Sequence, residues 1–383
     1  MNSFEFELDE EQRIVRQSAR EFAQREVLPL ARKIDQEHYF PKELVPKLSA
    51  AGYFGITVPS EYGGAELDYL SYVVIIEELA AVCASTSVIV SAHNSIACWP
   101  ILNFGSPEQK VKYLPKLAKG EHLGCFALSE PGTGSDAARQ TCMAKKKGDK
   151  WIINGVKNWI TNAPVADICV LFAMEKPEER HRGINCFIVE LKNHPGITIG
   201  KKEDKLGICG SPTASITFDN VELDGSALLG KAGDGFKIAM LTLDGGRCGI
   251  AAQAVGIARA SLEDSIKYAK ERQTFGKLLA EHQTIQNYIA DMSCKINAAR
   301  LLTYAATRRK VAKVSYTREA AEAKLFASEA AVYCALKAIQ IYGGYGYVKD
   351  FNVERYLRDA KITEIYEGTS EIQRLVIASQ LLK

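Results

Sequence analysis

"KWIINGVKNWITN", residues 150–162, is the stretch of this 383-residue chain that decides its fold. Tryptophan, isoleucine and valine are enriched in β-strands, and the glycine and asparagines between them are typical of turns. Further short runs of this kind follow it, among them "DICVLFAM", "INCFIVEL" and "ASITFDNVEL". Together they predict a small β domain in the middle of the chain.

Helical patterns flank this β-rich part on both sides. "DEEQRIVRQSAREFAQREV", residues 9–27, opens with Asp9 and Gln12 in the spacing of a capping box. Residues 69–99 are apolar nearly all round, which predicts a buried helix pair. After Phe236 the helical patterns return, and the Ala-rich residues 317–344 are typical of a helix bundle.

This order predicts three domains. We expect an N-terminal all-α domain over residues 1–124, a central small β-barrel or sandwich domain over residues 125–234, and a C-terminal four-helix-bundle-like domain over residues 235–383. A β module inserted between helical parts differs from the alternating βαβ units of a parallel α/β fold.

Composition excludes several classes of protein. The 48 Lys and Arg and 46 Asp and Glu give a net charge of +2, so no broad basic field is available for nucleic acid or an anionic membrane. The ten cysteines are scattered without a C-x-x-C pair, so we expect reduced core cysteines and no metal site. The acidic start lacks the features of a signal peptide, and no apolar run approaches the ~18 residues of a membrane span. We therefore expect a cytoplasmic protein without a membrane span.

Local patterns give ordinary interpretations for several polar residues. In "KITEIYEGTSEIQR", residues 361–374, the preference for glycine past a helix end predicts that Glu367 is exposed in a last helical turn. Asp244 and Arg247 in "TLDGGR" have the i,i+3 spacing of a surface ion pair. His93 has no second ligand at helical spacing, so we interpret it as a core histidine rather than a metal ligand.

Two glycine-rich stretches have two interpretations each. "FALSEPGTGSD", residues 126–136, offers exposed backbone N–H groups beside the hydroxyls of Ser129, Thr133 and Ser135. Such a loop either wraps a polar ring edge or phosphate, or simply joins two domains. "IYGGYGY", residues 341–347, follows an Ala-rich helix, so its glycines either stop the helix or let a ligand approach the backbone.

Taken together and in order, the motifs resemble those of the acyl-CoA dehydrogenase family over essentially the full length of the chain. The resemblance lies in "FALSEPGTGSD", "NWITN", "TFDNVEL", "LLGKAGDGFKIAMLTLDGGR", "ERQTFGKLLAEHQ", "QIYGGYGY" and "RDAKITEIYEGTSEIQ". It is closest to the short-chain, butyryl-CoA group.

The resemblance implies a flavoenzyme that binds FAD and converts a short-chain acyl-CoA into the trans-2-enoyl-CoA. This reaction needs a base at Cα and a hydride acceptor at Cβ, held on opposite sides of the substrate. The resemblance assigns the base to Glu367 and the acceptor to flavin N5, and it implies an electron-transferring flavoprotein as electron acceptor. Some branched-chain and long-chain relatives carry the base at the position of Gly246, where this chain has no carboxylate.

The resemblance also assigns binding residues. Substrate contacts fall to Ser135, Asp244, Arg247 and Gly368. FAD contacts fall to Phe126, Ala127, Leu128, Ser129, Gly132, Thr133, Gly134, Ser135, Trp159, Ile160, Thr161, Arg272, Gln273, Thr274, His282, Gln283, Gln340, Ile341, Tyr342, Gly343, Gly344, Thr369, Ser370 and Glu371. Because the residues from Gln340 to Gly344 match positions that reach the FAD of a neighbouring subunit, the resemblance implies a homotetramer.

Alternatives to a short straight-chain substrate stay open. The acyl group is alternatively alicyclic or branched, because pocket shape depends on packing. An oxidase that uses oxygen, and a catalytically silent member with a binding role, are the other candidates. A glutaryl-CoA type of enzyme is disfavoured, because residues 85–95, which should line the acyl pocket, contain no Arg or Lys. Cys209 stands where relatives commonly carry a basic or polar residue, so contacts there are expected to differ.

Overall fold

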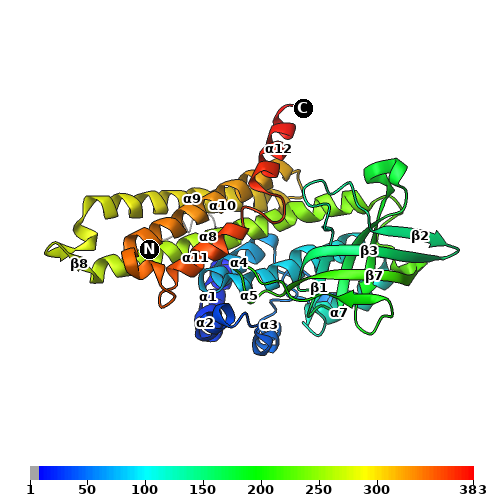
Figure 1. The fold of residues 1–383 in the computed structure, drawn as a ribbon, viewed down its shortest axis with the longest axis horizontal. Helices are drawn as coiled ribbons and strands as arrows, with labels where there is room; N and C mark the ends of the chain where they lie inside the picture. Colours follow the sequence, from blue (N-terminus) through cyan, green and yellow to red (C-terminus); the bar gives the residue numbers. More distant parts are fainter. Residues whose placement is uncertain (1–7) are drawn as a thin grey trace.

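Helices, then strands, then helices follow one another along the chain, which confirms the predicted fold class. The structure is a computed structural model that describes residues 8–383. Residues 1–7, on which the expectation about a signal peptide partly rests, lie outside the described part. In Figure 1 the sheet occupies one end of the molecule and the long C-terminal helices extend to the other. The domain limits, with boundaries after residues 124 and 234, stay a prediction.

The first block begins with the predicted capping box. The Asp9 side chain accepts a hydrogen bond from the Gln12 N–H at 2.8 Å, and the Gln12 side chain accepts one from the Asp9 N–H at 3.2 Å. The block consists of α1 (Glu10–Phe22), η2 (Ala23–Val27), α2 (Leu28–Gln36), η3 (Lys42–Leu44), α3 (Val45–Ala50), η4 (Ser60–Tyr62), α4 (Tyr69–Val82), α5 (Ala84–Ala92), η5 (His93–Cys98), α6 (Trp99–Phe104) and α7 (Pro107–Ala118).

The predicted buried helix pair is α4 and α5. The extended backbone of Cys83 ends α4 and precedes α5. Every residue of α5 is buried. His93, just after α5, is fully buried and lies 3.0 Å from the Leu117 carbonyl through Nε2, while its Nδ1 accepts the Gly124 N–H at 3.1 Å. It is therefore a core histidine, as predicted, and residues 8–383 contain no cluster of side chains suited to a metal ion.

The middle block forms one curled seven-stranded sheet in the order β1-β4-β2-β3-β7-β6, with β5 paired to β4. Strands β4 and β5 are buried almost throughout, so they form its interior. The block consists of β1 (Gly124–Ala127), β2 (Met143–Lys147), β3 (Lys150–Thr161), β4 (Ile168–Met174), η6 (Pro177–Gly183), β5 (Ile184–Glu190), β6 (Ile197–Ile199), β7 (Thr213–Asp224) and η7 (Gly225–Ala227).

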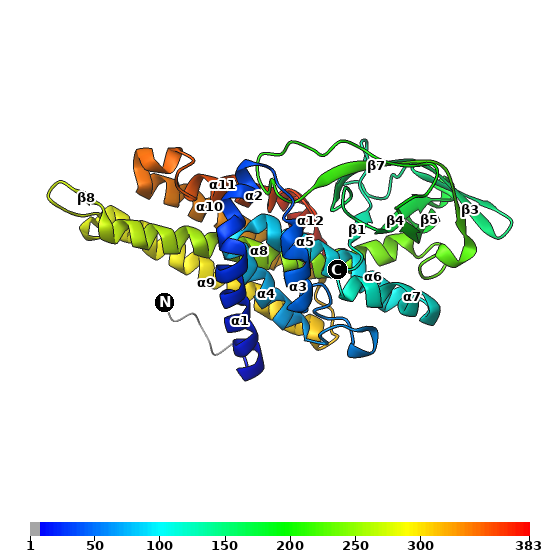
Figure 2. The same ribbon diagram turned by 90° about the horizontal axis from the view of Figure 1, so that it is seen from below.

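The last block is a bundle built around α8, a 37-residue helix that is about 55 Å long. Its apolar core is continuous with that of the first block, because α4, α8, α9 and α10 contribute to one cluster of buried side chains. Figure 2 shows α4 beside α8 and α9. The block consists of α8 (Gly235–Glu271), β8 (Gln273–Thr274), β9 (Lys277–Leu278), η8 (Leu279–Glu281), α9 (Gln283–Val311), α10 (Thr317–Tyr342), η9 (Gly343–Tyr347), α11 (Val353–Ile362) and α12 (Ser370–Leu381).

The cysteines and the possibility of a membrane span are the two other features addressed by composition. All ten cysteines are free; nine are buried and behave as small core residues, while Cys294 is exposed. Across residues 8–383 no helix combines the length and the apolarity needed to cross a membrane.

Candidate active site

Glu367 lies in the turn between α11 and α12. The prediction of an exposed last helical turn is wrong, because α11 already ends at Ile362. Glu367 and Gly368 both adopt left-handed backbone, with φ of 52° and 94°. Such a conformation is unfavourable for glutamate and must be held by its surroundings. Gly368 has a second reason to be glycine, since an added Cβ would lie 2.5 Å from Gln373 Nε2.

The Glu367 carboxylate points at α8, where Gly246 has no side chain. A Cβ at Gly246 would lie 2.0 Å from Glu367 Oε2, so the carboxylate occupies the space that the glycine leaves. Oε2 is buried and has no hydrogen-bond partner among the described residues. Burial raises the pKa of Glu367 to about 7, while the charges of Lys324 and Arg247 oppose this rise. A buried carboxylate with a free oxygen and a near-neutral pKa is suited to general-base catalysis.

Asp244 and Arg247 form a buried ion pair beside this carboxylate. Their side chains meet at 2.6 Å, and Thr317 donates a second hydrogen bond of 2.6 Å to Asp244. The predicted surface ion pair is therefore wrong in its location, because both side chains are almost fully buried. Burial raises the pKa of Asp244 above its ordinary value. Arg247 Nε has no partner among the described residues, so it remains available to a ligand.

A cleft of about 670 Å³ opens next to Asp244. The Lys310 ammonium lies in it over the rings of Tyr69 and Trp99, at 4.2 and 4.3 Å from their centroids, and donates to the Tyr316 hydroxyl at 2.9 Å. Burial lowers the pKa of Lys310 to about 8. The cleft thus joins a cation and aromatic rings to one of the predicted substrate residues.

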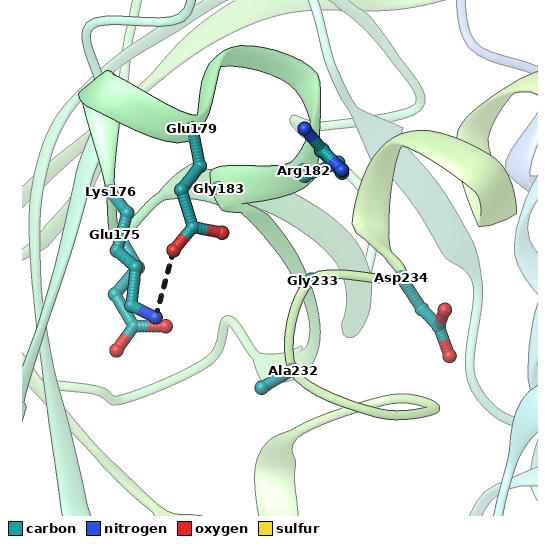
Figure 3. A pocket seen from close by; sticks show the side chains of 8 residues that line it. All are labelled: Glu175, Lys176, Glu179, Arg182, Gly183, Ala232, Gly233 and Asp234. Atoms are coloured by element: carbon teal, nitrogen blue, oxygen red, sulfur yellow. Dashed lines mark hydrogen bonds and ion pairs between the residues drawn. The ribbon is translucent and has the colours of Figure 1, made fainter.

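A second pocket, of about 300 Å³, lies between η6 and the start of α8 (Figure 3). It carries charges of both signs, and Lys176 pairs with Glu179 there at 3.1 Å. None of the predicted site residues lines it. We therefore place the candidate site at Glu367 and not in this pocket.

The loop over residues 126–136 and the end of β3 meet directly. The Asn158 N–H donates to the Ser129 carbonyl at 2.9 Å. The register of β3 shifts just before Ile160, and Trp159 has a φ of 61°, which leaves its side chain 60% exposed. The buried Thr133 hydroxyl has no partner among the described residues. An exposed aromatic ring and an unsatisfied hydroxyl on two segments that meet fit a planar, polar cofactor at this edge of the sheet.

Three of the remaining predicted FAD residues, Thr369, Ser370 and Glu371, begin α12 directly after the Glu367 turn. The others form a distal group at the opposite end of α8: Arg272, Gln273, Thr274, His282, Gln283 and Gln340–Gly344. Arg272 begins this group and lies over the Tyr345 ring at 5.7 Å, so the β8–β9 hairpin and the end of α10 are adjacent. Gly343 stops α10 with a φ of 61°, as one of its two interpretations predicted. In Figure 1 this end lies far from the sheet. One chain therefore does not bring the two groups of predicted FAD residues together.

Sequence reasoning missed two residues that contact the Glu367 turn. Lys324 of α10 donates to the Gly368 carbonyl at 2.7 Å, and Gln373 of α12 donates to the carbonyls of both Glu367 and Gly368. Lys324 shares a helical stripe with the small residues Ala320 and Ala327. A lysine on an otherwise buried stripe was the available signal.

Three domain profiles of one family match the chain. They are the N-terminal, middle and C-terminal domains of acyl-CoA dehydrogenase, which match residues 9–121, 125–221 and 233–382. The mitochondrial short-chain specific acyl-CoA dehydrogenase of Mus musculus is 50% identical over 98% of this chain and 91% of its own length.

Solved structures are similar over the whole chain. Butyryl-CoA dehydrogenase from Megasphaera elsdenii has a TM-score of 0.96 at 43% identity, covering 98% of this chain and 99% of its own. A chain described as electron transferring flavoprotein of Acidaminococcus fermentans has a TM-score of 0.96 at 46% identity, with the same coverage. A glutaryl-CoA dehydrogenase from Mycobacterium smegmatis in complex with FADH2 has a TM-score of 0.94 at 31% identity, covering 99% of this chain and 96% of its own.

Proposed function

Because this chain belongs to the acyl-CoA dehydrogenase family, we propose that it dehydrogenates a short-chain acyl-CoA to the trans-2-enoyl-CoA with Glu367 as the base. The observation that carries this proposal is the position of the Glu367 carboxylate. Its Oε2 is buried, has no hydrogen-bond partner among residues 8–383, and lies in the gap beside Gly246. The alternative position for a base, at residue 246 itself, holds a glycine.

The mechanism follows from what the side chains around this carboxylate do. Burial raises the proton affinity of Glu367, so it can accept the weakly acidic Cα proton of a thioester near neutral pH. Within the described part of the chain the backbone N–H of Glu367 donates no hydrogen bond, so it is free to donate to a developing enolate oxygen. When bound, FAD supplies the acceptor for the Cβ hydride.

The cleft beside Asp244 supports a CoA thioester as substrate. Lys310 and Lys313 line it, and cations suit the phosphates of CoA. Residues 85–95, proposed to face the acyl group, are buried and contain no Arg or Lys. The names of the similar proteins favour a short straight acyl chain over an alicyclic or branched one.

The predicted FAD residues at the edge of the sheet and those of the distal group can bind one FAD only if they come from different subunits. The exposed Trp159 and the unpartnered Thr133 hydroxyl would hold the ring system, and the distal group of a second subunit would hold the rest. No atom of residues 8–383 lies within 4 Å of a Cβ added at Gly343 or Gly344, which leaves room for an approaching group. We propose a homotetramer on this ground, an electron-transferring flavoprotein as electron acceptor, and the cytoplasm as compartment.

The test of the proposed function is Glu367→Gln. The amide keeps the shape of the side chain and loses its basicity, so FAD and acyl-CoA should still bind. After rapid anaerobic mixing with butyryl-CoA, we expect flavin reduction to slow by roughly 10² to 10⁴. The matched control is Glu364→Gln in the same turn, whose carboxylate pairs with Lys361 at 2.6 Å. Reduction by Glu367→Gln within a few-fold of the wild-type rate would refute the assignment.

A further inference from the structure

We propose that Lys324 and Gln373 are positioning residues that hold the base in place, and that Lys324 also supplies the counter-charge of the Glu367 carboxylate. This inference rests on the proposed role of Glu367 as base. Neither residue is among those that the family resemblance assigned.

The position of the Lys324 ammonium is unusual for a lysine. Its side chain is fully buried, and its hydrogen bond of 2.7 Å goes to the Gly368 carbonyl, a neutral acceptor. Among the described residues no carboxylate forms an ion pair with it. A buried ammonium without a nearby anion is strongly disfavoured. The anion that its surroundings offer is Glu367, the residue next to its hydrogen-bond acceptor.

Gln373 holds the same turn from the other side. Its side chain is fully buried, and Nε2 donates to the Glu367 carbonyl at 3.2 Å and to the Gly368 carbonyl at 2.9 Å. Glu367 and Gly368, whose carbonyls accept these bonds, are the two residues of the turn with left-handed backbone. Because a glutamate in this conformation is strained, bonds from α10 and α12 to the turn are what keep the carboxylate aimed at Gly246.

The other groups around the base do not replace the charge of Lys324. On α8, Arg247 is paired with Asp244 at 2.6 Å. On α4, the pKa values of Tyr69 and Tyr72 are raised, so both stay neutral, and the same holds for Tyr366. Besides Glu367, two acidic groups lie near Lys324. Glu364 is paired with Lys361, and Glu371 lies in the first turn of α12.

The expected consequence is a base that is ionised in a larger fraction of molecules at neutral pH than it would be without Lys324. Burial lowers the pKa of Lys324 to about 8, and the Glu367 charge opposes this shift. In return, the Lys324 charge opposes the rise in the pKa of Glu367. Removing the ammonium should therefore raise the pKa of Glu367 further and protonate more of the base at a given pH. Removing Gln373 should disturb the geometry without this change in charge.

The experiment compares the pH dependence of flavin reduction by butyryl-CoA in the FAD-loaded holoenzyme. For Lys324→Met, we expect the acidic limb of the pH–rate profile to move to higher pH by about one unit. The rate at pH 6 should then be about tenfold lower, and the rate at high pH should stay near that of wild type. For Gln373→Leu, we expect a lower rate at every pH and an unmoved limb. Lys337→Met, on the same helix with its ammonium over the Tyr288 ring, is the control and should change neither.

Lys324→Gln separates the charge from the hydrogen bond, because the amide can still donate to the Gly368 carbonyl. It should move the limb as Lys324→Met does, and it replaces that variant if the methionine prevents FAD binding. A limb within about 0.2 units of wild type in the neutral variants, while Glu367→Gln is inactive, overturns this inference and leaves the proposed function standing. Full activity of Glu367→Gln would instead overturn the proposed function itself.

Discussion

Gly246 matters because of the atom it lacks. An added Cβ would lie 2.0 Å from Glu367 Oε2, so Gly246→Ala must displace the carboxylate. We expect flavin reduction by butyryl-CoA to fall by about 10², because a displacement of about 1 Å has this effect on well-aligned reactions. FAD content, measured on the same sample, should stay at the wild-type level. A variant that keeps both its FAD and its rate would contradict this role of the glycine.

The buried carboxylate also predicts a pH-dependent stability. The folded-state pKa of Glu367, about 7, lies above its ordinary value of 4.5, so its contribution to stability is lost as the pH rises through 7. The neutral variant Glu367→Gln should therefore be more stable than wild type at pH 8, by about 3 kcal/mol, and similar to it near pH 4.5. Thermal unfolding of both proteins at the two pH values measures the difference. An equal difference at both values would show that Glu367 is not a perturbed acid.

At the level of single residues, motif order predicts Glu367 as the base but contains no information on its geometry. Nothing in "YEGTSE" reveals a left-handed glutamate, because the conformation depends on hydrogen bonds from Lys324 and Gln373, which lie on other helices. The burial of Asp244 was hidden for a similar reason. Its i,i+3 spacing to Arg247 is the same on an exposed and on a covered helix, and packing of the bundle decides between them.

At the level of elements, a buried ion pair joins the loop over residues 126–136 to β3. Lys157 Nζ donates to Glu130 at 2.8 Å and to the Leu128 carbonyl at 3.0 Å, and both charged side chains are buried. Lys157→Met leaves the Glu130 carboxylate without its cation. We expect a loss of about 3 to 5 kcal/mol in the free energy of unfolding.

The loss should be accompanied by weaker FAD binding, because the same strand carries Trp159. Fluorescence titration with FAD measures this, and chemical denaturation measures stability. The matched control is Lys150→Met on the same strand, whose exposed pair with Glu222 at 3.2 Å should contribute less than about 1 kcal/mol. Equal effects of the two substitutions would contradict the role of the buried pair.

The elements themselves followed from the sequence where a pattern was long and regular. The capping box at Asp9, the buried pair α4 and α5, and the order of helices and strands were all predicted. The end of α11 was not, because residues after Ile362 remain compatible with a helix in their local pattern. The chain leaves the helix there and Thr363 donates back to the Ala360 carbonyl.

For the whole molecule, the separation of the two FAD groups predicts that assembly and cofactor binding depend on each other. Arg272→Ala changes a residue about 50 Å along α8 from the β domain, yet it should weaken FAD binding. Light scattering and absorbance of the flavin on the same sample measure both properties. A wild-type monomer with full FAD occupancy would contradict the proposal.

The length of α8 has a consequence for inheritance of defects. If each catalytic centre takes its base from one subunit and its distal residues from another, two differently damaged copies of the chain can share one intact centre. A subunit with Glu367→Gln and a subunit with Arg272→Ala, each impaired alone, would complement when co-expressed, because half of the centres in a mixed pair would combine an intact base with an intact distal group. Each centre would then be the joint product of two polypeptides.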